Sequence, residues 1–461
     1  MTQVSRDGQP NRGSKLDRSQ SPIEVQCGRG VCVPSYSAAE LNSNCFCVTA
    51  DPEAVRAKLE PLLRSRGVDD SMQETHPHLF ASLPVYVPHA QIERIARVVA
   101  AIEEVIGLPA YRSEVMLGAS AIARVDPGSP GGLLGLDFHL TPDNIGLIEI
   151  NTNPGGVLLN TVLGQAQSLC MPEIMKVPTD LLQVENAVVQ AFQTEWRLQG
   201  RSEPLTSIAI VDESPTEQYL YPEFCLFQDL FRRHGLRADI CRPEALVHRS
   251  SRLWLNGEPV DMIYNRLTDF ALEEEGHARL RAAYESDEVV LSPHPRAHAL
   301  YADKRNLVLL SDPEFLRRAG ASPMSVESLF RAVPRTYLVS PQNRDSLWGN
   351  RRNLFFKPSA GYGSKAAYRG DKLTRRVWDE ISSGKTYVAQ ELVKPSERQV
   401  SAHSDPLKVD IRCYAYQGQI LLYAARMYQG QTTNFRTPSG GFAPVLTLAE
   451  PGQGVEADAG N

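Results

Sequence analysis

Residues 133–156 hold the feature that most constrains this fold, two apolar runs separated by a tight turn. The runs cover 133–140 and 145–150, and the residues between them read Thr-Pro-Asp-Asn. Pro followed by Asp or Asn suits a tight turn, and short apolar runs on either side of it are typical of strands. The sequence therefore predicts an antiparallel hairpin.

Three oxygen donors fall on this hairpin. In a strand, side chains two residues apart share a face, so Glu149 and Asn151 point the same way, and a loop centred on Asp143 places Asp137 directly opposite Glu149. Two carboxylates and an amide oxygen suit Mg²⁺, which also keeps waters and takes ligands from phosphates. The alternative is an ordinary half-buried hairpin whose polar residues face water.

The same hairpin carries a family resemblance. Asp137-Phe138, followed by Glu149-Ile-Asn-Thr-Asn-Pro-Gly155, resembles the metal-binding signature of ATP-grasp ligases such as D-alanine-D-alanine ligase. The resemblance implies ATP and two Mg²⁺ ions as cofactors, with Asp137, Glu149 and Asn151 as metal ligands.

Two later segments carry lysines suited to phosphate. Lys304 follows Asp303 at the start of an expected helix, where the resemblance implies a contact with the α-phosphate; a solvated helix lysine is the alternative. Lys357 ends an apolar strand and leads into a glycine-containing loop, whose backbone N–H groups can face an anion. The loop residues expected to bind nucleotide are Gly361, Tyr362, Gly363 and Ser364. A plain hairpin turn is the alternative, and the Walker pattern is absent.

The last third of the chain matches the remaining parts of an ATP-grasp site. Residues 386–393 resemble the strand and hinge that receive adenine, with Gln390, Glu391, Leu392 and Val393 as the implied contacts and Glu391 placed for the ribose. Two strands are expected at 408–416 and 423–426, and their residues Arg412 and Arg426 flank a phosphate path. The segment with Asn434, Gly440 and Gly441 resembles one that would hold a tetrahedral oxyanion.

The order of these segments differs from that of common ATP-grasp enzymes, because the metal hairpin comes first. Eukaryotic glutathione synthetase shows this order, and the resemblance covers roughly 88–445. The fold class implied is α/β, a circularly permuted α+β ATP-grasp fold with a small doubly wound pre-ATP-grasp domain and a disordered N-terminal tail. One departure stands out: glutathione synthetase has an acidic metal ligand in the loop that here reads Pro358-Ser-Ala-Gly361.

The predicted division of the chain follows from these segments. An amphipathic helix at 88–106 should back the hairpin, and other helices are expected at 51–66 and 181–196. Strands at 208–211, 236–240, 253–255, 262–264 and 289–293, with a helix at 224–234, predict the small doubly wound sheet. The expected divisions are a disordered tail at 1–22, a peripheral region at 23–87, the permuted half with the metal site at 88–200, the substrate domain at 205–295, the nucleotide-binding half at 300–446 and a flexible tail at 447–461.

Composition sets outer limits on function. A chain of 461 residues with net charge −6 gives no argument for nucleic-acid affinity, and no apolar run approaches the ~20 residues that span a bilayer. The first 22 residues lack an apolar signal core, so a cytoplasmic protein is expected. Cys27, Cys32, Cys45 and Cys47 have spacings unlike a usual zinc knuckle, which favours reduced thiols over a zinc site.

The resemblance implies an ATP-dependent carboxylate–amine ligase that works through an acyl phosphate and releases ADP and phosphate. Its partners would be a small carboxylate and an amine, such as an amino acid or short peptide, and a homodimer is left open. Two alternatives remain: a small-molecule kinase on the same fold, and a non-catalytic ATP-binding regulator, which would be expected to lose the metal ligands present here.

Overall fold

The computed structural model describes residues 36–65, 67, 71–167, 175–359, 366–384 and 386–448. Two compact units divide the chain, Met1–Ser37 and Ala38–Asn461, and the second is described below. The tails predicted at 1–22 and 447–461 lie outside the described residues, apart from the end of the last strand. None of the described helices is long and apolar enough to cross a membrane.

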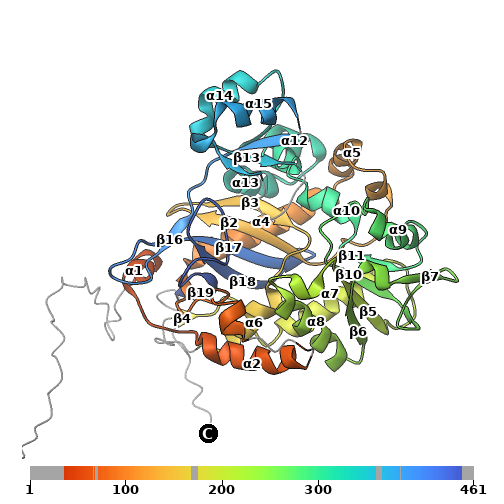
Figure 1. Ribbon diagram of the computed structural model, residues 1–461. Helices are drawn as coiled ribbons and strands as arrows, with labels where there is room; N and C mark the ends of the chain where they lie inside the picture. Colours follow the sequence, from red (N-terminus) through yellow and green to blue (C-terminus); the bar gives the residue numbers. More distant parts are fainter. Residues whose placement is uncertain are drawn as a thin grey trace, which may run out of the picture. The chain divides into compact units, whose positions relative to one another are not determined.

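The largest sheet joins the predicted hairpin to the last strands of the chain. Its main path runs β1-β19-β18-β17-β2-β3, with β16 on β17 and β4 on β19 (Figure 1). The bounds are β1 (Val85–Tyr86), β2 (Leu134–Leu140), β3 (Ile145–Asn151), β4 (Met175–Lys176), β16 (Ser396–Arg398), β17 (Leu407–Tyr416), β18 (Gln419–Tyr428) and β19 (Gly441–Leu448). Strand β2 pairs antiparallel with β17, so segments almost three hundred residues apart share one sheet.

The hairpin of β2 and β3 contains a β-bulge that fixes its register. Leu140 pairs with Ile145, so the turn is centred between Pro142 and Asp143, and the register shifts by one residue beside Asp137. Because of this shift Asp137 lies opposite Glu149, as predicted. The extra residue is Ile148, which has no partner in the ladder.

One face of the main sheet is apolar and packs on helix α4 (His89–Gly107). Apolar residues that alternate along β2 and β17 form one buried cluster with α4 and α13 (Pro323–Ala332). The predicted helix at 88–106 therefore backs the hairpin. The opposite face carries charged residues at one end, while at the other Tyr414 and Tyr416 pack in the cluster built on α6 (Val157–Gln165), α7 (Val184–Leu198) and α8 (Tyr221–Arg233).

Strand β19 was not predicted, and it ties the end of the chain to the start of α4. Its residues Val445 and Leu446 pair in parallel with β1, which lies directly before α4. This pairing brings the strand that begins at Gly441 close to the start of that helix.

A second sheet is entirely parallel and has the order β11-β10-β5-β6. The strands are β5 (Ser207–Val211), β6 (Arg237–Cys241), β10 (Met262–Asn265) and β11 (Val290–Ser292), with α8 (Tyr221–Arg233) between the first two. The predicted strand at 253–255 is β8 (Arg252–Leu255), which belongs instead to an antiparallel sheet with β7 (Val247–Arg249) and β9 (Glu258–Val260). Its assignment to the doubly wound sheet was wrong, because short hairpin turns join β7, β8 and β9 to one another.

A fourth sheet carries the second predicted lysine. It has the order β12-β15-β13-β14, and its strands are β12 (Thr336–Leu338), β13 (Leu354–Pro358), β14 (Tyr368–Arg369) and β15 (Tyr387–Glu391). The remaining helices are α1 (Ala38–Asn44), α2 (Pro52–Arg64), α3 (Met72–Thr75), α5 (Pro109–Leu117), α6 (Val157–Gln165), α7 (Val184–Leu198), α9 (Ala278–Glu285), α10 (Pro295–Ala297), α11 (Asn306–Leu310), α12 (Pro313–Ala319), α14 (Arg344–Asn350) and α15 (Arg375–Ser383).

Candidate functional site

Charged side chains form a row across four neighbouring strands of the main sheet. Glu149 on β3 lies opposite Asp137 on β2, and Asp137 lies opposite Arg412 on β17. Asp410, two residues before Arg412 and on the same face, lies opposite Arg426 on β18. The row therefore combines three carboxylates with two guanidinium groups.

Asp137 is the centre of this row and is almost fully buried. Arg412 donates to both of its oxygens at 2.7 Å, and Arg426 forms an ion pair with Oδ2 at 2.9 Å. Burial alone would raise the pKa of this carboxyl, but the two guanidinium groups hold it well below its ordinary value. Asp137 is consequently ionised at any pH near neutral.

Asp410, the next carboxylate in the row, also binds a guanidinium group. Its Oδ1 accepts a bond of 2.6 Å from Arg426 Nε, and its Oδ2 accepts one from Thr433 Oγ1. Burial would lower the pKa of Arg426, but Asp137 and Asp410 together raise it above its ordinary value. Arg426 is thus a fixed positive charge held between two carboxylates.

Glu149 and Asn151 differ from the two aspartates. Both are half-buried, and the Asn151 amide donates to Asp137 at 3.2 Å and to Glu149 at 3.3 Å. No arginine or lysine in the described chain forms an ion pair with Glu149 within 4.0 Å. Its charge is therefore not neutralised by direct contact.

The bulge connects the hairpin to the sheet that carries Lys357. Lys357 Nζ donates to the carbonyl of Ile148, the bulged residue, at 2.7 Å, and to Gln390 Oε1 at 2.8 Å. Gln390 in turn donates to the Leu147 carbonyl at 3.2 Å. Burial lowers the pKa of Lys357 to about 8, although Glu149 acts in the opposite direction. The lysine can thus lose its proton at mildly alkaline pH.

The predicted adenine hinge, residues 390–393, lies at the end of β15 and just after it. Several of its backbone groups have hydrogen-bond partners within the chain. The Glu391 and Leu392 amides donate to the carbonyls of Arg335 and Asn353. The Val393 carbonyl is hydrogen-bonded to His139 Nδ1 at 2.7 Å. Burial lowers the pKa of His139, which favours the neutral ring in this contact.

These groups surround one cleft, whose empty volume is about 920 Å³ when the part open to solvent is counted. The cleft is lined by residues from the main sheet, the fourth sheet and the segment after β18. They are Asp137, His139, Ile148, Glu149, Asn151, Lys304, Phe355, Lys357, Pro358, Ala367, Gln390, Glu391, Leu392, Val393, Asp410, Arg426, Tyr428, Gln431, Thr432 and Thr433.

Most of the predicted site residues lie in this lining, and a few do not. Arg412 lies behind Asp137 and is buried. Asn434, Gly440 and Gly441 are not in the lining: the Asn434 amide donates to the Gln429 and Thr432 carbonyls, and the Gly440 amide to Thr437. Gly361, Tyr362, Gly363 and Ser364 lie outside the described residues.

Sequence reasoning missed His139 and Asp410 as members of the site. The signal for Asp410 was available, because it is two residues from Arg412 and must share its strand face. His139 gave no such signal: its contact with Val393 joins residues 254 positions apart.

Comparison with known proteins supports this fold. No protein-family model matches the chain, and no curated protein matches its sequence. A glutathione synthetase-like effector from Globodera pallida, solved in the apo form, has a TM-score of 0.50 and 12% identity, with 86% of this chain and 98% of that chain covered. A structure named as a gamma-glutamylcysteine synthetase from Methylobacillus flagellatus gives a TM-score of 0.45 at 12% identity, over 78% and 87% of the two chains. The ATP-grasp ligase PsnB gives a TM-score of 0.30 at 16% identity, with 53% of this chain and 77% of that chain covered.

Of these likenesses, the one to the effector is strong enough to define a fold. The chain therefore shares its overall fold with the glutathione synthetase-like effector.

Proposed function

We propose that this protein is an ATP-dependent ligase that joins a carboxylate to an amine and releases ADP and phosphate. The observation that carries the proposal is the shared cleft: the charged row of the main sheet faces Lys304 and Lys357, and the predicted hinge lies beside them. Such a cleft offers positive charge for phosphates, carboxylate oxygens for a metal, and an apolar edge for a base.

The donor set fits Mg²⁺ at one part of this cleft. Glu149 and Asn151 lie side by side on β3, line the cleft and offer a carboxylate and an amide oxygen. Asp137 lies next to them, but both of its oxygens accept bonds from arginine. We propose that Glu149 and Asn151 hold the ion directly and that Asp137 mainly fixes Arg412 and Arg426. When bound, Mg²⁺ would neutralise charge on the phosphates of ATP.

The chain's own residues would position the reaction. Lys357 and Lys304 would contact the ATP phosphates, and Gln390 to Val393 would border the adenine and ribose. Arg426, fixed between two carboxylates, would offset the negative charge that develops as the γ-phosphoryl group passes to the acceptor carboxylate. Attack by the amine on the resulting acyl phosphate would form the amide bond and expel phosphate.

We further propose that the chain is a circular permutation of the common ATP-grasp order. Two pairings support this: β2 from the first third of the chain lies beside β17, and β1 lies beside β19. On this view 88–200 and 300–446 are two halves of one nucleotide-binding domain, and 205–295 is a substrate domain inserted between them.

The test is a comparison of Glu149→Gln with wild type in an ATP-consumption screen over amino acids, dipeptides and polyamines. The variant removes one charge with little change in volume, so turnover at saturating Mg²⁺ should fall by at least about 100-fold while the melting temperature stays within a few degrees. Glu93→Gln, an exposed residue on α4, is the matched control and should turn over ATP as wild type does.

The products separate ligase from kinase. Mass spectrometry should find an amide of the two substrates together with ADP and phosphate. A phosphorylated acceptor that accumulates without an amide would identify a kinase, and an undiminished turnover of Glu149→Gln would refute the site.

A further inference from the structure

A second group of ligand atoms lies away from the cleft lining, at the carboxyl ends of two parallel strands. Glu213 follows β5, and the loop that contains Glu274 and His277 follows β10, its neighbour in the sheet. In the order β11-β10-β5-β6, the chain passes from β5 to β6 on one side and from β10 to β11 on the other. The two loops therefore leave the sheet at the point where the strand order reverses. Ligands of open parallel sheets commonly bind at such a position.

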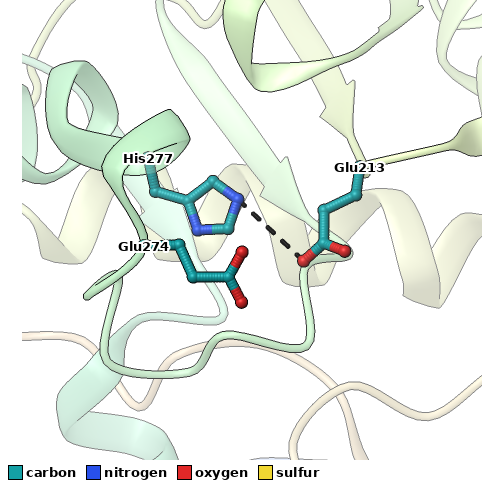
Figure 2. A group of neighbouring side chains, drawn as sticks. All are labelled: Glu213, Glu274 and His277. Carbon is teal, nitrogen blue, oxygen red and sulfur yellow. Dashed lines mark ion pairs between the residues drawn. The ribbon is translucent and has the colours of Figure 1, made fainter.

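The three side chains converge from different segments, as Figure 2 shows. One ligand atom from each, a nitrogen of His277 and a carboxylate oxygen of each glutamate, lies within 4.8 Å of the other two. His277 Nε2 is 4.0 Å from Glu213 Oε1, too far for a hydrogen bond. Two ligands of one tetrahedral zinc ion are about 3.4 Å apart, since each bond is about 2.1 Å. Small rotations of the Glu213 side chain, which is 44% exposed, and of the exposed Glu274 side chain would close the group around an ion.

The group joins a buried imidazole to a carboxylate oxygen that lacks a hydrogen bond. His277 has only 3% of its side chain exposed, and its Nε2 faces the two carboxylates and forms an ion pair of 4.0 Å with Glu213, drawn dashed in Figure 2. Glu213 Oε1 is buried and has no hydrogen-bond partner in the described chain. Leaving such an oxygen without a hydrogen bond is costly, and a cation between it and the imidazole would satisfy it.

Asp269 orients the histidine. Its Oδ2 lies 2.8 Å from His277 Nδ1 and also accepts a bond of 2.8 Å from the Glu274 amide. A carboxylate on one ring nitrogen places the proton there and leaves the lone pair of the other nitrogen for a metal, which is the usual arrangement around metal-binding histidines.

We propose that Glu213, Glu274 and His277 form a second metal site, for a divalent first-row transition ion such as Zn²⁺ or Mn²⁺. One imidazole nitrogen with carboxylate oxygens favours these ions over Mg²⁺, which prefers oxygen alone. The site joins the loop after β5 to the loop after β10. It is separate from the proposed cleft and does not depend on the proposed function.

The experiment uses the full-length chain without nucleotide and with Glu149→Gln throughout, so that the cleft does not compete for metal. Zn²⁺ is titrated by calorimetry, and Mn²⁺ by pulsed electron paramagnetic resonance, which detects imidazole nitrogen on the ion. One ion per chain should bind, with a nitrogen coupling. Added Glu274→Gln should weaken binding at least about tenfold, and Asp269→Asn about 10–100-fold.

Glu273→Gln is the matched control, because this neighbouring exposed carboxylate is outside the group. It should bind both ions within about twofold of its parent, whereas His277→Gln, checked for folding by circular dichroism, should lose the nitrogen coupling. Equal affinity in Glu273→Gln and Glu274→Gln, absence of the nitrogen coupling in the parent, or no binding of either ion would overturn the proposal.

Discussion

Replacing Asp137 by asparagine should destabilise the protein far more than replacing its partner Glu149 by glutamine. Asp137 is 3% exposed and holds Arg412 through two bonds of 2.7 Å and Arg426 through one ion pair of 2.9 Å. Removing one member of a buried ion pair leaves the other charge uncompensated and costs ~3–5 kcal/mol.

The loss in free energy of unfolding within this range depends on the contacts that the two arginines keep. Arg426 keeps its bond of 2.6 Å to Asp410, whereas Arg412 keeps only a long contact of 3.5 Å to the Gly155 carbonyl. The loss should therefore come mainly from Arg412, and since asparagine still offers one acceptor oxygen, ~3 kcal/mol is expected. Glu149→Gln should cost less than ~1 kcal/mol, because Glu149 is half-buried and the bond that it accepts within the described residues, from Asn151, is long at 3.3 Å.

Urea unfolding, compared between variants of equal m value, measures these differences. The pKa of Asp137 is lowered in the folded state, so the ion pair stabilises wild type above the ordinary carboxyl pKa, about 3.9, and this contribution is lost as the pH falls below it. The deficit of Asp137→Asn should thus be constant from pH 5 to 8 and shrink in more acid solution. A double variant, Asp137→Leu with Arg412→Met, should recover most of the stability, because replacing both members of a buried pair by apolar groups is often neutral. A loss below ~1 kcal/mol for Asp137→Asn, or a double variant as unstable as the single one, would refute this reasoning.

The other predictions concern a lysine and a glycine. Because the pKa of Lys357 is lowered to about 8, nucleotide affinity should be constant below pH 7 and weaken by up to about tenfold per pH unit above pH 8, as the lysine loses its proton. Calorimetry on Lys357→Met should find weaker nucleotide binding without that pH dependence. A wild-type affinity unchanged from pH 7 to 9.5 would contradict the assignment of Lys357 to the phosphates. Gly441→Ala should lower the free energy of unfolding by at least ~2 kcal/mol, because φ is +101° and the added Cβ would lie 2.4 Å from the His78 carbonyl oxygen. Gly200→Ala, also at positive φ but with nothing within 4 Å of its Cβ, is the control and should lose clearly less in the same urea unfolding experiment.

Much of the architecture follows from local patterns in the chain. Residues 88–106 form a helix with its apolar face on the sheet because apolar side chains recur at helical spacing, and the structure gives His89–Gly107. The hairpin at 133–150 and the parallel strands at 208–211, 236–240 and 262–264 were predicted from short apolar runs bounded by turns. The strand β19 was missed; it pairs with β18, the strand before it in the chain, and with β1, which lies far away in sequence.

The register of the hairpin shows how a correct prediction can rest on an incomplete reason. A loop centred on Asp143 would place Asp137 opposite Glu149, but the turn is centred half a residue earlier. The bulge at Ile148 restores the pairing by adding one residue to β3, and it leaves the Ile148 carbonyl for Lys357, which comes from another sheet. The sequence supplies the residues of this contact, but not the bulge.

By itself the sequence determined which residue types could make a nucleotide and metal site, since strand periodicity sets which neighbours share a face. It placed Asp137, Glu149 and Asn151 together because all three lie within one hairpin. Only the tertiary structure decided that two arginines more than 270 residues away would neutralise Asp137, while no arginine or lysine among the described residues forms an ion pair with Glu149. The physical reason is that a carboxylate's role depends on which charges surround it in space, and pairings between distant strands are set by packing of the whole sheet rather than by local sequence.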